Sequence, residues 1–287
     1  MRSDFCIFIL TYGRPHNQRT LNTLQKMGVK HPIYFVCSDD DKELGEYQKL
    51  YGDKVLVFNK EQAVKEMGID LMDNFGNRKA IIYARNYAFV LAKRLGYRYF
   101  WELDDDYYEF AFADFKRGKW ESLSTYERGF RGMDSMIEAC LEYYASNPKL
   151  LGLSFSQGGD FIGGLDNKQR VKRKCMNSFF CDTERPFLFR GTLNEDVNFY
   201  AGDGARDGIC MQLHSMKLQQ TGTQKTDGGM KEIYLDGGTY VKSFYSIMIN
   251  PSAVKISLMG DLHLRLHHRI DYNRICPKII REEYKHG

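Results

Sequence analysis

The sequence YRYFWELDDD, residues 97–106, joins an aromatic, largely apolar run to three consecutive aspartates. The run Tyr97–Leu103 predicts a buried strand, because short apolar segments of this length are typical of parallel sheets. A strongly periodic helix is predicted just before it, over Asn77–Leu95, and Gly96 marks the end of that helix. The aspartates therefore follow the carboxyl end of a strand, which is where open α/β sheets bind their ligands.

The residues before this stretch alternate between strand and helix patterns. Apolar runs predict three further strands, at Phe5–Leu10, Ile33–Cys37 and Lys54–Phe58. Helical periodicity is found between them, at Asn17–Met27 and Lys42–Tyr51. Strands and helices that alternate at this spacing indicate βαβ units and an α/β fold with a mostly parallel sheet.

The pattern after residue 107 is less regular. We expect helices at Arg131–Ser146 and Asp196–Tyr200, strands at Leu150–Phe155 and Phe187–Arg190, and a polar, glycine-rich loop or lid at Gln219–Gly229. The sequence has no internal repeat and no clear linker. We therefore expect one domain over residues 1–287, with a nucleotide-binding half at 1–110 and an acceptor half with a C-terminal tail at 111–287.

The composition restricts the class of protein. A hydrophobic content of 43% and a charged content of 27% predict a folded domain with a sizeable core. The net charge of +4 is mild, so it allows a polyanionic partner without requiring one. The seven cysteines are scattered and form no CxxC pair, which favours reduced thiols in the cytoplasm. We also expect no signal peptide and no membrane span.

The aspartate run suits a divalent metal. Alternate side chains of an extended segment point the same way, so Asp104 and Asp106 are expected to face one ligand, and Asp105 is expected to face elsewhere. Two converging carboxylates repel each other, and Mg²⁺ or Mn²⁺ would remove this repulsion while binding a diphosphate. The alternative interpretation is a solvated acidic turn, because such short motifs occur freely.

Two other clusters are candidates for chemistry or binding. Glu195 and Asp196 follow Asn194 at the start of a predicted helix, where a carboxylate could accept a proton from an attacking hydroxyl. Acidic residues also favour first helical turns for electrostatic reasons alone. Five basic residues fill a seven-residue segment at Lys168, Arg170, Lys172, Arg173 and Lys174. Such a run can grip a phosphate backbone, or it can be a solvated loop.

The combination of these motifs resembles the GT-A glycosyltransferases. The resemblance rests on TYGRP at residues 11–15, the acidic Asp39–Asp41, the helix with Ala84-Arg85-Asn86, LDDD at residues 103–106, and Asn194-Glu195-Asp196 with the histidine-bearing tail. Within that superfamily, the chain resembles the phage-type TET/JBP-associated enzymes that glycosylate hydroxymethylpyrimidines in DNA. The resemblance implies a GT-A, Rossmann-like α/β fold, in which helices flank a mixed, mostly parallel sheet and the C-terminal half binds the acceptor.

The resemblance also implies roles for individual residues. The nucleotide-sugar is expected to be a UDP-sugar. The residues expected to bind it are Thr11, Tyr12, Arg14, Asp39, Arg85 and Asp104. Those expected to bind Mn²⁺ or Mg²⁺ are Asp104, Asp106 and a histidine, either His263 or His267. Asp196 is the preferred catalytic base, and Glu195 is the alternative. The expected acceptor is double-stranded DNA with a hydroxymethylated base, which must be flipped out of the duplex to react.

Three alternatives stay open at this point. The same chemistry could act on a carbohydrate or polysaccharide-precursor acceptor. A chain without turnover would instead be a nucleic-acid-binding module on the same fold. A nucleotidyltransferase also uses paired aspartates, but it is less favoured because Thr11–Pro15 contains a single glycine and no glycine-rich phosphate loop.

Overall fold

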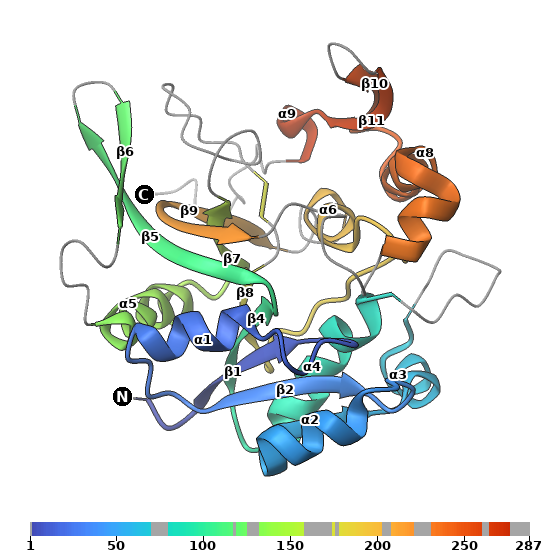
Figure 1. Cartoon of the computed structure of the whole chain (residues 1–287). Helices are drawn as coiled ribbons and strands as arrows, with labels where there is room; N and C mark the ends of the chain where they lie inside the picture. The colour runs from blue at the N-terminus through green and yellow to red at the C-terminus, as the bar shows by residue number, and fades with distance from the viewer. Residues whose placement is uncertain are drawn as a thin grey trace.

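The computed structural model describes residues 2–69, 80–116, 119–124, 132–157, 174–175, 178–202, 208–220, 231–259 and 264–275. Within these ranges, a nine-stranded sheet of order β3-β2-β1-β4-β8-β7-β9-β5-β6 extends through both halves of the chain. Helices cover the sheet, and a separate two-stranded sheet, β10-β11, lies beside α8 (Figure 1). The α/β class predicted from the sequence is confirmed.

The N-terminal strands form the parallel part of the sheet. They are β1 (Phe5–Leu10), β2 (Ile33–Ser38), β3 (Val55–Phe58) and β4 (Tyr99–Asp104). Each neighbouring pair in the order β3-β2-β1-β4 is parallel, and the register places Leu10 beside Asp104. The four predicted strands are therefore confirmed to within two residues at each end, and the carboxyl ends of β1 and β4 meet.

The helices of this half follow the predictions with two differences. They are α1 (Arg19–Lys26), α2 (Leu44–Tyr51), the short 3-10 turn η1 (Gly52–Lys54), α3 (Lys60–Met67) and α4 (Ile82–Arg94). Helix α3 was not predicted. Helix α4 begins later than the predicted Asn77, since residues 80 and 81 are not helical and residues 77–79 lie outside the described ranges.

The sheet has two differently covered faces. Side chains alternate along β1 and β4, so Phe8, Leu10 and Phe100 point to the face covered by α4, while Ile9 and Trp101 point to the face covered by α1 and α5. By the same alternation, Glu102 and Asp104 belong to the α4 face. Helix α4 is buried around most of its circumference, as expected of a helix that lies between a sheet and further structure.

The second half of the sheet is mostly antiparallel. Its strands are β5 (Tyr107–Lys116), β6 (Lys119–Ser124), β7 (Leu150–Gln157), β8 (Ser178–Asp182) and β9 (Ile209–Gln220). The pairings are antiparallel except for that of β7 with β9, so the sheet is mixed, as predicted. The two predicted helices of this half are found as α5 (Met133–Ser146) and α6 (Glu195–Ala201).

The predicted strand at Phe187–Arg190 is wrong. The backbone groups that a strand would pair are bound by a side chain instead. The Phe189 N–H donates to Asn86 Oδ1 at 2.9 Å, and its carbonyl accepts from Asn86 Nδ2 at 3.0 Å. Asn198 Nδ2 also donates to the Arg190 carbonyl at 2.8 Å, so this segment is irregular chain held by two asparagines.

The C-terminal region consists of α8 (Lys231–Ile249), the hairpin of β10 (Val254–Met259) and β11 (Arg265–Ile270), and α9 (Tyr272–Ile275). His267 lies on strand β11, and His263 is outside the described residues. Of the predicted loop at Gln219–Gly229, the first two residues end β9 and the rest lie outside the described ranges. None of the described helices has the length and hydropathy needed to cross a bilayer.

Candidate functional site

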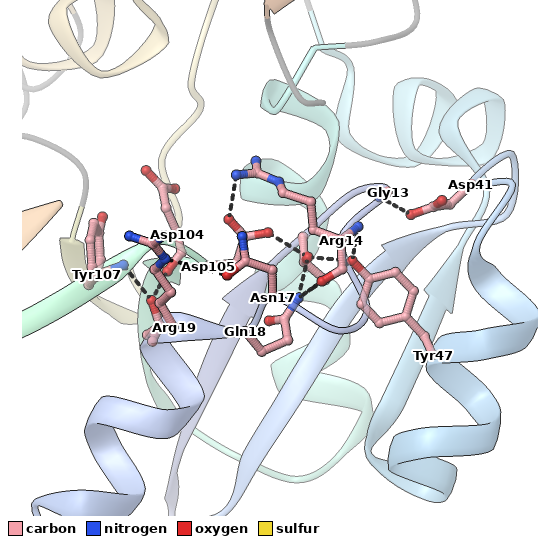
Figure 2. A network of polar contacts seen from close by, with 12 residues as sticks. Gly13, Arg14, Asn17, Gln18, Arg19, Asp41, Tyr47, Asp104, Asp105 and Tyr107 are labelled. Atoms are coloured by element: carbon pink, nitrogen blue, oxygen red, sulfur yellow. Dashed lines mark hydrogen bonds and ion pairs between the residues drawn. The ribbon is translucent and has the colours of Figure 1, made fainter. Parts of the chain in front are cut away.

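The candidate site lies where β1 and β4 end side by side. Thr11 follows β1 directly, and Asp105 follows β4 directly, so residues almost a hundred positions apart in the chain meet at one sheet edge. Two polar networks start there. We call them the Thr11 network (Thr11, Arg14, Gln18, Tyr47 and Asp105) and the Arg85 network (Arg85, Glu102, Asp104 and Glu195); Figure 2 shows the first and its neighbours.

The Thr11 network is built on one hydroxyl. Thr11 donates to Asp105 Oδ2 at 2.7 Å, and the Tyr47 hydroxyl lies 2.6 Å from Thr11 Oγ1. Gln18 Nε2 also donates to Thr11 Oγ1, at 2.9 Å. Because Thr11 is buried and its hydroxyl is fully engaged, it holds the loop after β1 in place.

The same network fixes the turn at Gly13 and Arg14 (Figure 2). Gly13 has a φ of 70°, a left-handed conformation that glycine adopts without strain. Its N–H donates to Asp41 Oδ2 at 2.8 Å, while the Arg14 N–H donates to the Tyr47 hydroxyl at 2.9 Å. The Arg14 guanidinium lies 3.3 Å from Asp105 Oδ1, and its Nε is buried without a hydrogen-bond partner among the described residues.

The end of β2 provides a third group of side chains. Asp39 is exposed and accepts a hydrogen bond from Asn59 Nδ2 at 2.6 Å. Asp40 is paired with Lys60 at 2.8 Å, and the Lys60 ammonium lies 5.2 Å from the centre of the Tyr12 ring. Tyr12 and Asp39 therefore lie at the same sheet edge as Thr11, as predicted from the strand ends.

Arg85 is the centre of the second network. It extends from α4 and is 1% exposed. Its Nη1 donates to Glu102 Oε1 at 2.6 Å, its Nη2 to Asp104 Oδ1 at 2.9 Å, and its Nε to Glu195 Oε1 at 3.0 Å. One guanidinium thus joins β4 to the start of α6, and the fixed geometry of its donors sets where the carboxylates lie.

The Arg85 network holds more negative than positive charge. Burial raises the pKa of Glu102 to about 7, although the Arg85 guanidinium acts in the opposite direction. Burial also raises the pKa of Asp104, and it raises that of Asp106 to about 7, with further contributions from Asp104 and Asp105. Since one guanidinium serves several carboxylates, an additional cation would be favourable here.

The three aspartates do not continue as an extended segment. Asp104 is the last residue of β4, and Asp105 and Asp106 form a turn. Thr20 closes this turn, because its hydroxyl donates to the Asp104 carbonyl at 2.6 Å and accepts from the Tyr107 N–H at 2.9 Å. The strand alternation used to pair Asp104 with Asp106 is therefore wrong, although Asp105 does face away from Arg85, toward Thr11.

The acidic pair Glu195-Asp196 forms the first turn of α6, as predicted. Asn194 precedes it with a φ of 57°, and its Nδ2 donates to the Lys242 carbonyl at 2.9 Å and lies 3.1 Å from His268 Nδ1. Asp196 is buried, and this burial raises its pKa to about 6, with a further contribution from Glu195. A buried carboxyl that titrates near neutrality is suited to proton transfer.

The predicted histidine ligand is not identified. His267 lies next to His268, with 4.3 Å between ring centres. Burial lowers the pKa of His268 to about 2, so this imidazole is neutral. No three His, Cys, Asp or Glu side chains among the described residues gather as a metal-binding group. The expectation for His263 falls outside the described residues, and that for His267 stays a prediction.

The predicted basic cluster is described only at its end. Lys174 is half-buried and lies near enough to Asp196 for the two charges to interact, while burial lowers the pKa of the Lys174 ammonium. The other four basic residues lie outside the described ranges, namely Lys168, Arg170, Lys172 and Arg173.

Several residues of the site were not predicted from the sequence. Glu102 had a usable signal, because a carboxylate inside an apolar strand is almost never buried without a partner. Tyr47 and Gln18 had no such signal, since tyrosine and glutamine occur commonly on helices and in turns. Their roles depend on contacts between distant segments.

The chain matches one family model, and several solved structures are similar to it. The model of a family described as TET-associated glycosyltransferase matches residues 5–229. No curated protein matches the chain. Among solved structures, the chain is similar to a protein from Desulfovibrio desulfuricans G20 described as a nucleotide-diphospho-sugar transferase, with 11% identity, 78% of this chain and 84% of that chain covered, and a TM-score of 0.41.

A second similar structure is glucosyl-3-phosphoglycerate synthase from Mycobacterium tuberculosis in complex with Mn²⁺ and UDP-glucose. It has 9% identity, covers 93% of this chain and 86% of its own, and gives a TM-score of 0.49. The same enzyme in complex with Mg²⁺ and UDP also has 9% identity, with 93% and 87% covered and a TM-score of 0.46. At these identities the similarity concerns the fold.

Proposed function

The chain belongs to the TET-associated glycosyltransferase family, and from this premise we propose that it transfers a sugar from a nucleotide-sugar, a UDP-sugar in the first place, to the hydroxymethyl group of a modified pyrimidine in DNA. The main support is the Arg85 network, in which a single buried guanidinium binds both Asp104 and Glu195. It joins the proposed donor side of the site to the proposed acceptor side.

The donor side fits a divalent cation. Asp104 and Asp106 provide carboxylate oxygens, which Mg²⁺ and Mn²⁺ prefer, and these ions commonly take one or two carboxylates and complete their coordination with substrate phosphates. Glu102 Oε2 is buried without a hydrogen-bond partner among the described residues, which is a further sign of uncompensated negative charge. When bound, the metal would neutralise charge on the diphosphate leaving group.

The residues of the Thr11 network would shape the nucleotide side. Thr11 holds the loop, so that Tyr12 and Arg14 are presented at the sheet edge beside Asp39. The unpartnered Arg14 Nε is a donor available to a ligand oxygen. Arg85 has all three of its nitrogens engaged with carboxylates, so we propose that it acts on the donor through Asp104.

The acceptor side requires a base. We propose that Asp196 accepts the proton of the acceptor hydroxyl, whose oxygen then bonds to the anomeric carbon as the bond to the nucleoside diphosphate breaks. Asp196 is preferred to Glu195 because Glu195 Oε1 already accepts a hydrogen bond from Arg85, so this oxygen is engaged in the Arg85 network. Lys174 near Asp196 supports an anionic acceptor such as DNA.

The proposal is tested with a panel of nucleotide-sugars and duplexes that contain hydroxymethylcytosine, hydroxymethyluracil or unmodified bases, with mass spectrometry of the digested DNA as the readout. We expect a sugar-sized mass increase on one hydroxymethylated base, dependent on Mn²⁺ or Mg²⁺. The Asp106→Asn variant, which lacks one of the proposed metal ligands, is the matched control for metal dependence. Transfer to a carbohydrate acceptor but never to DNA would overturn the assignment of DNA as the acceptor. A protein that never releases free nucleotide from any donor, with or without acceptor, would support a binding module instead.

A further inference from the structure

The hairpin β10–β11 has two cations on one face, Lys255 and Arg269, that the proposed reaction does not use. The register pairs Lys255 with Arg269 and Ser257 with His267. These four residues share one face because side chains alternate along each strand, and we call this the outer face of the hairpin. The other face includes His268, which is buried.

The opposite face of the hairpin, which includes His268 and which we call the inner face, fixes the hairpin to the acceptor side of the site. His268 Nδ1 lies 3.1 Å from Asn194 Nδ2, directly before the acidic pair. Ser243 of α8 donates to the Leu266 carbonyl at 3.4 Å. The hairpin lies beside α8, with α6 nearby (Figure 1). The outer face is therefore held close to the acceptor side of the site.

The outer face places two positive charges opposite each other. Lys255 and Arg269 are both exposed, and like charges that face each other across an antiparallel pair are destabilising. Neither forms an ion pair with any residue that the structure describes. The nearest acid in the sequence, Asp271, is engaged elsewhere, since its Oδ2 lies 3.4 Å from Arg274 and its Oδ1 accepts from the Asn273 N–H at 3.0 Å. A polyanion would offset this repulsion.

We propose that the outer face of the β10–β11 hairpin binds the phosphate backbone of the acceptor DNA beside the target base. DNA presents a regular row of negative charges, about one per 3.4 Å along each strand, so two adjacent cations can contact neighbouring phosphates. The family match ends at residue 229, whereas the hairpin begins at Val254, so this contact is a feature of the C-terminal region of this chain. The inference rests on the proposed function.

The proposed contact is a binding contact and takes no part in the chemistry. Phosphate contacts position a duplex and contribute affinity that falls with salt, without reading the sequence. Removing the two charges should therefore raise KM for the DNA acceptor and leave kcat unchanged. Binding should weaken equally for hydroxymethylated and unmodified duplexes.

The test compares two double variants that lose the same charge. Lys255→Gln with Arg269→Gln removes the proposed contact, while Lys26→Gln with Lys93→Gln removes two exposed cations from α1 and α4. Binding to a fluorescein-labelled hydroxymethylcytosine duplex is followed by anisotropy over a range of salt concentrations. We expect the hairpin variant to bind roughly tenfold more weakly at low salt and its log–log salt slope to fall by about two, with the control close to the unchanged protein. Each single variant should lower the slope by about one.

The outcomes separate this inference from the proposed function. If the hairpin variant binds DNA with the same affinity and salt slope as the control and still transfers sugar to DNA, the inference is overturned. The proposed function is then unaffected. An unchanged protein that neither binds nor modifies DNA overturns both. Loss of binding to phosphatidylserine vesicles, with DNA binding intact, would assign the face to a membrane surface and also overturn the inference. Circular dichroism of every variant verifies that the fold is kept.

Discussion

Two polar networks that differ in charge balance start from the neighbouring aspartates Asp104 and Asp105. In the Thr11 network, Asp105 accepts a hydrogen bond from Thr11 and lies beside Arg14, so one carboxylate has both a hydroxyl and a cation. In the Arg85 network, Asp104 shares one guanidinium with Glu102 and Glu195. The first network is close to charge balance and shapes the loop after β1, whereas the second has uncompensated negative charge.

The comparison shows how a strand end separates adjacent residues. Glu102 and Asp104 lie on the α4 face of β4, where Arg85 reaches both of them. The turn closed by Thr20 then directs Asp105 to the opposite side, toward α1 and α2. Adjacent aspartates therefore differ in role. Asp105 helps to hold the loop after β1, whereas Asp104 belongs to the network where an additional cation would be favourable. The following substitutions test that division.

The largest effect is expected for Arg85→Gln. Removing one partner of a buried ion pair leaves uncompensated buried charge, so we expect unfolding to become easier by about 3–5 kcal/mol, with loss of transfer. Urea unfolding followed by circular dichroism measures this. The control is Arg94→Gln, which removes an exposed cation from the same helix as Arg85. Arg94 pairs with Glu66 of α3, and its loss should change stability by about 0.5 kcal/mol or less. A similar small change for both variants would contradict the central role of Arg85.

Asp106→Asn should separate activity from stability. We expect transfer to fall by roughly 10²–10³-fold, because the proposed metal loses a ligand and the leaving group loses stabilisation. The unfolding free energy should be unchanged or slightly higher, since the variant removes one charge from a crowded acidic region. Steady-state nucleotide release at saturating Mn²⁺ and a parallel urea titration test both expectations. Full activity would overturn the metal assignment.

The acid limb of the pH profile should identify Asp196 as the base. Its carboxyl must be ionised to accept a proton, and its pKa is raised to about 6, so kcat/KM should fall about tenfold for each pH unit below that value. The charged groups around it are Glu195, Arg85, Lys242 and Lys174. We expect Asp196→Asn to lower kcat by roughly 10²-fold and to remove the limb.

Glu195→Gln is the matched control for this profile. It removes the neighbouring negative charge, so the limb should move to lower pH and stay present. A limb that disappears in Glu195→Gln and stays in Asp196→Asn would reverse the two assignments.

Asp105→Asn should have the smallest effect of the four on the reaction. The amide keeps an acceptor for the Thr11 hydroxyl but loses the ion pair with Arg14, so we expect a loss of about 1–2 kcal/mol in unfolding free energy. Transfer should stay within about tenfold of the unchanged protein, because Asp105 faces away from Arg85. The same two measurements as for Asp106→Asn apply. A loss of transfer as large as that of Asp106→Asn would erase the distinction between the networks.

The parallel half of the fold was predictable from the sequence. The largely apolar runs at Phe5–Leu10 and Tyr97–Leu103 predicted buried strands, and the strands found there are buried on both faces of the sheet. The positions of the polar residues after each strand follow directly, since parallel strands present their carboxyl ends at one edge. The sequence alone thus determined that acidic residues would gather at one edge of the sheet.

The assignment of each aspartate was decided only by tertiary structure. The direction of Asp105 depends on Thr20 and Thr11. The Asp104 carboxylate is bound by Arg85, which reaches Glu195 across 110 residues of chain. The failure of the predicted strand at Phe187–Arg190 has the same origin, since Asn86 binds the backbone of Phe189. Local patterns fix which segments are buried, because burial depends on apolar content. Partners in a polar network are fixed by the packing of distant segments, which only the folded chain brings together.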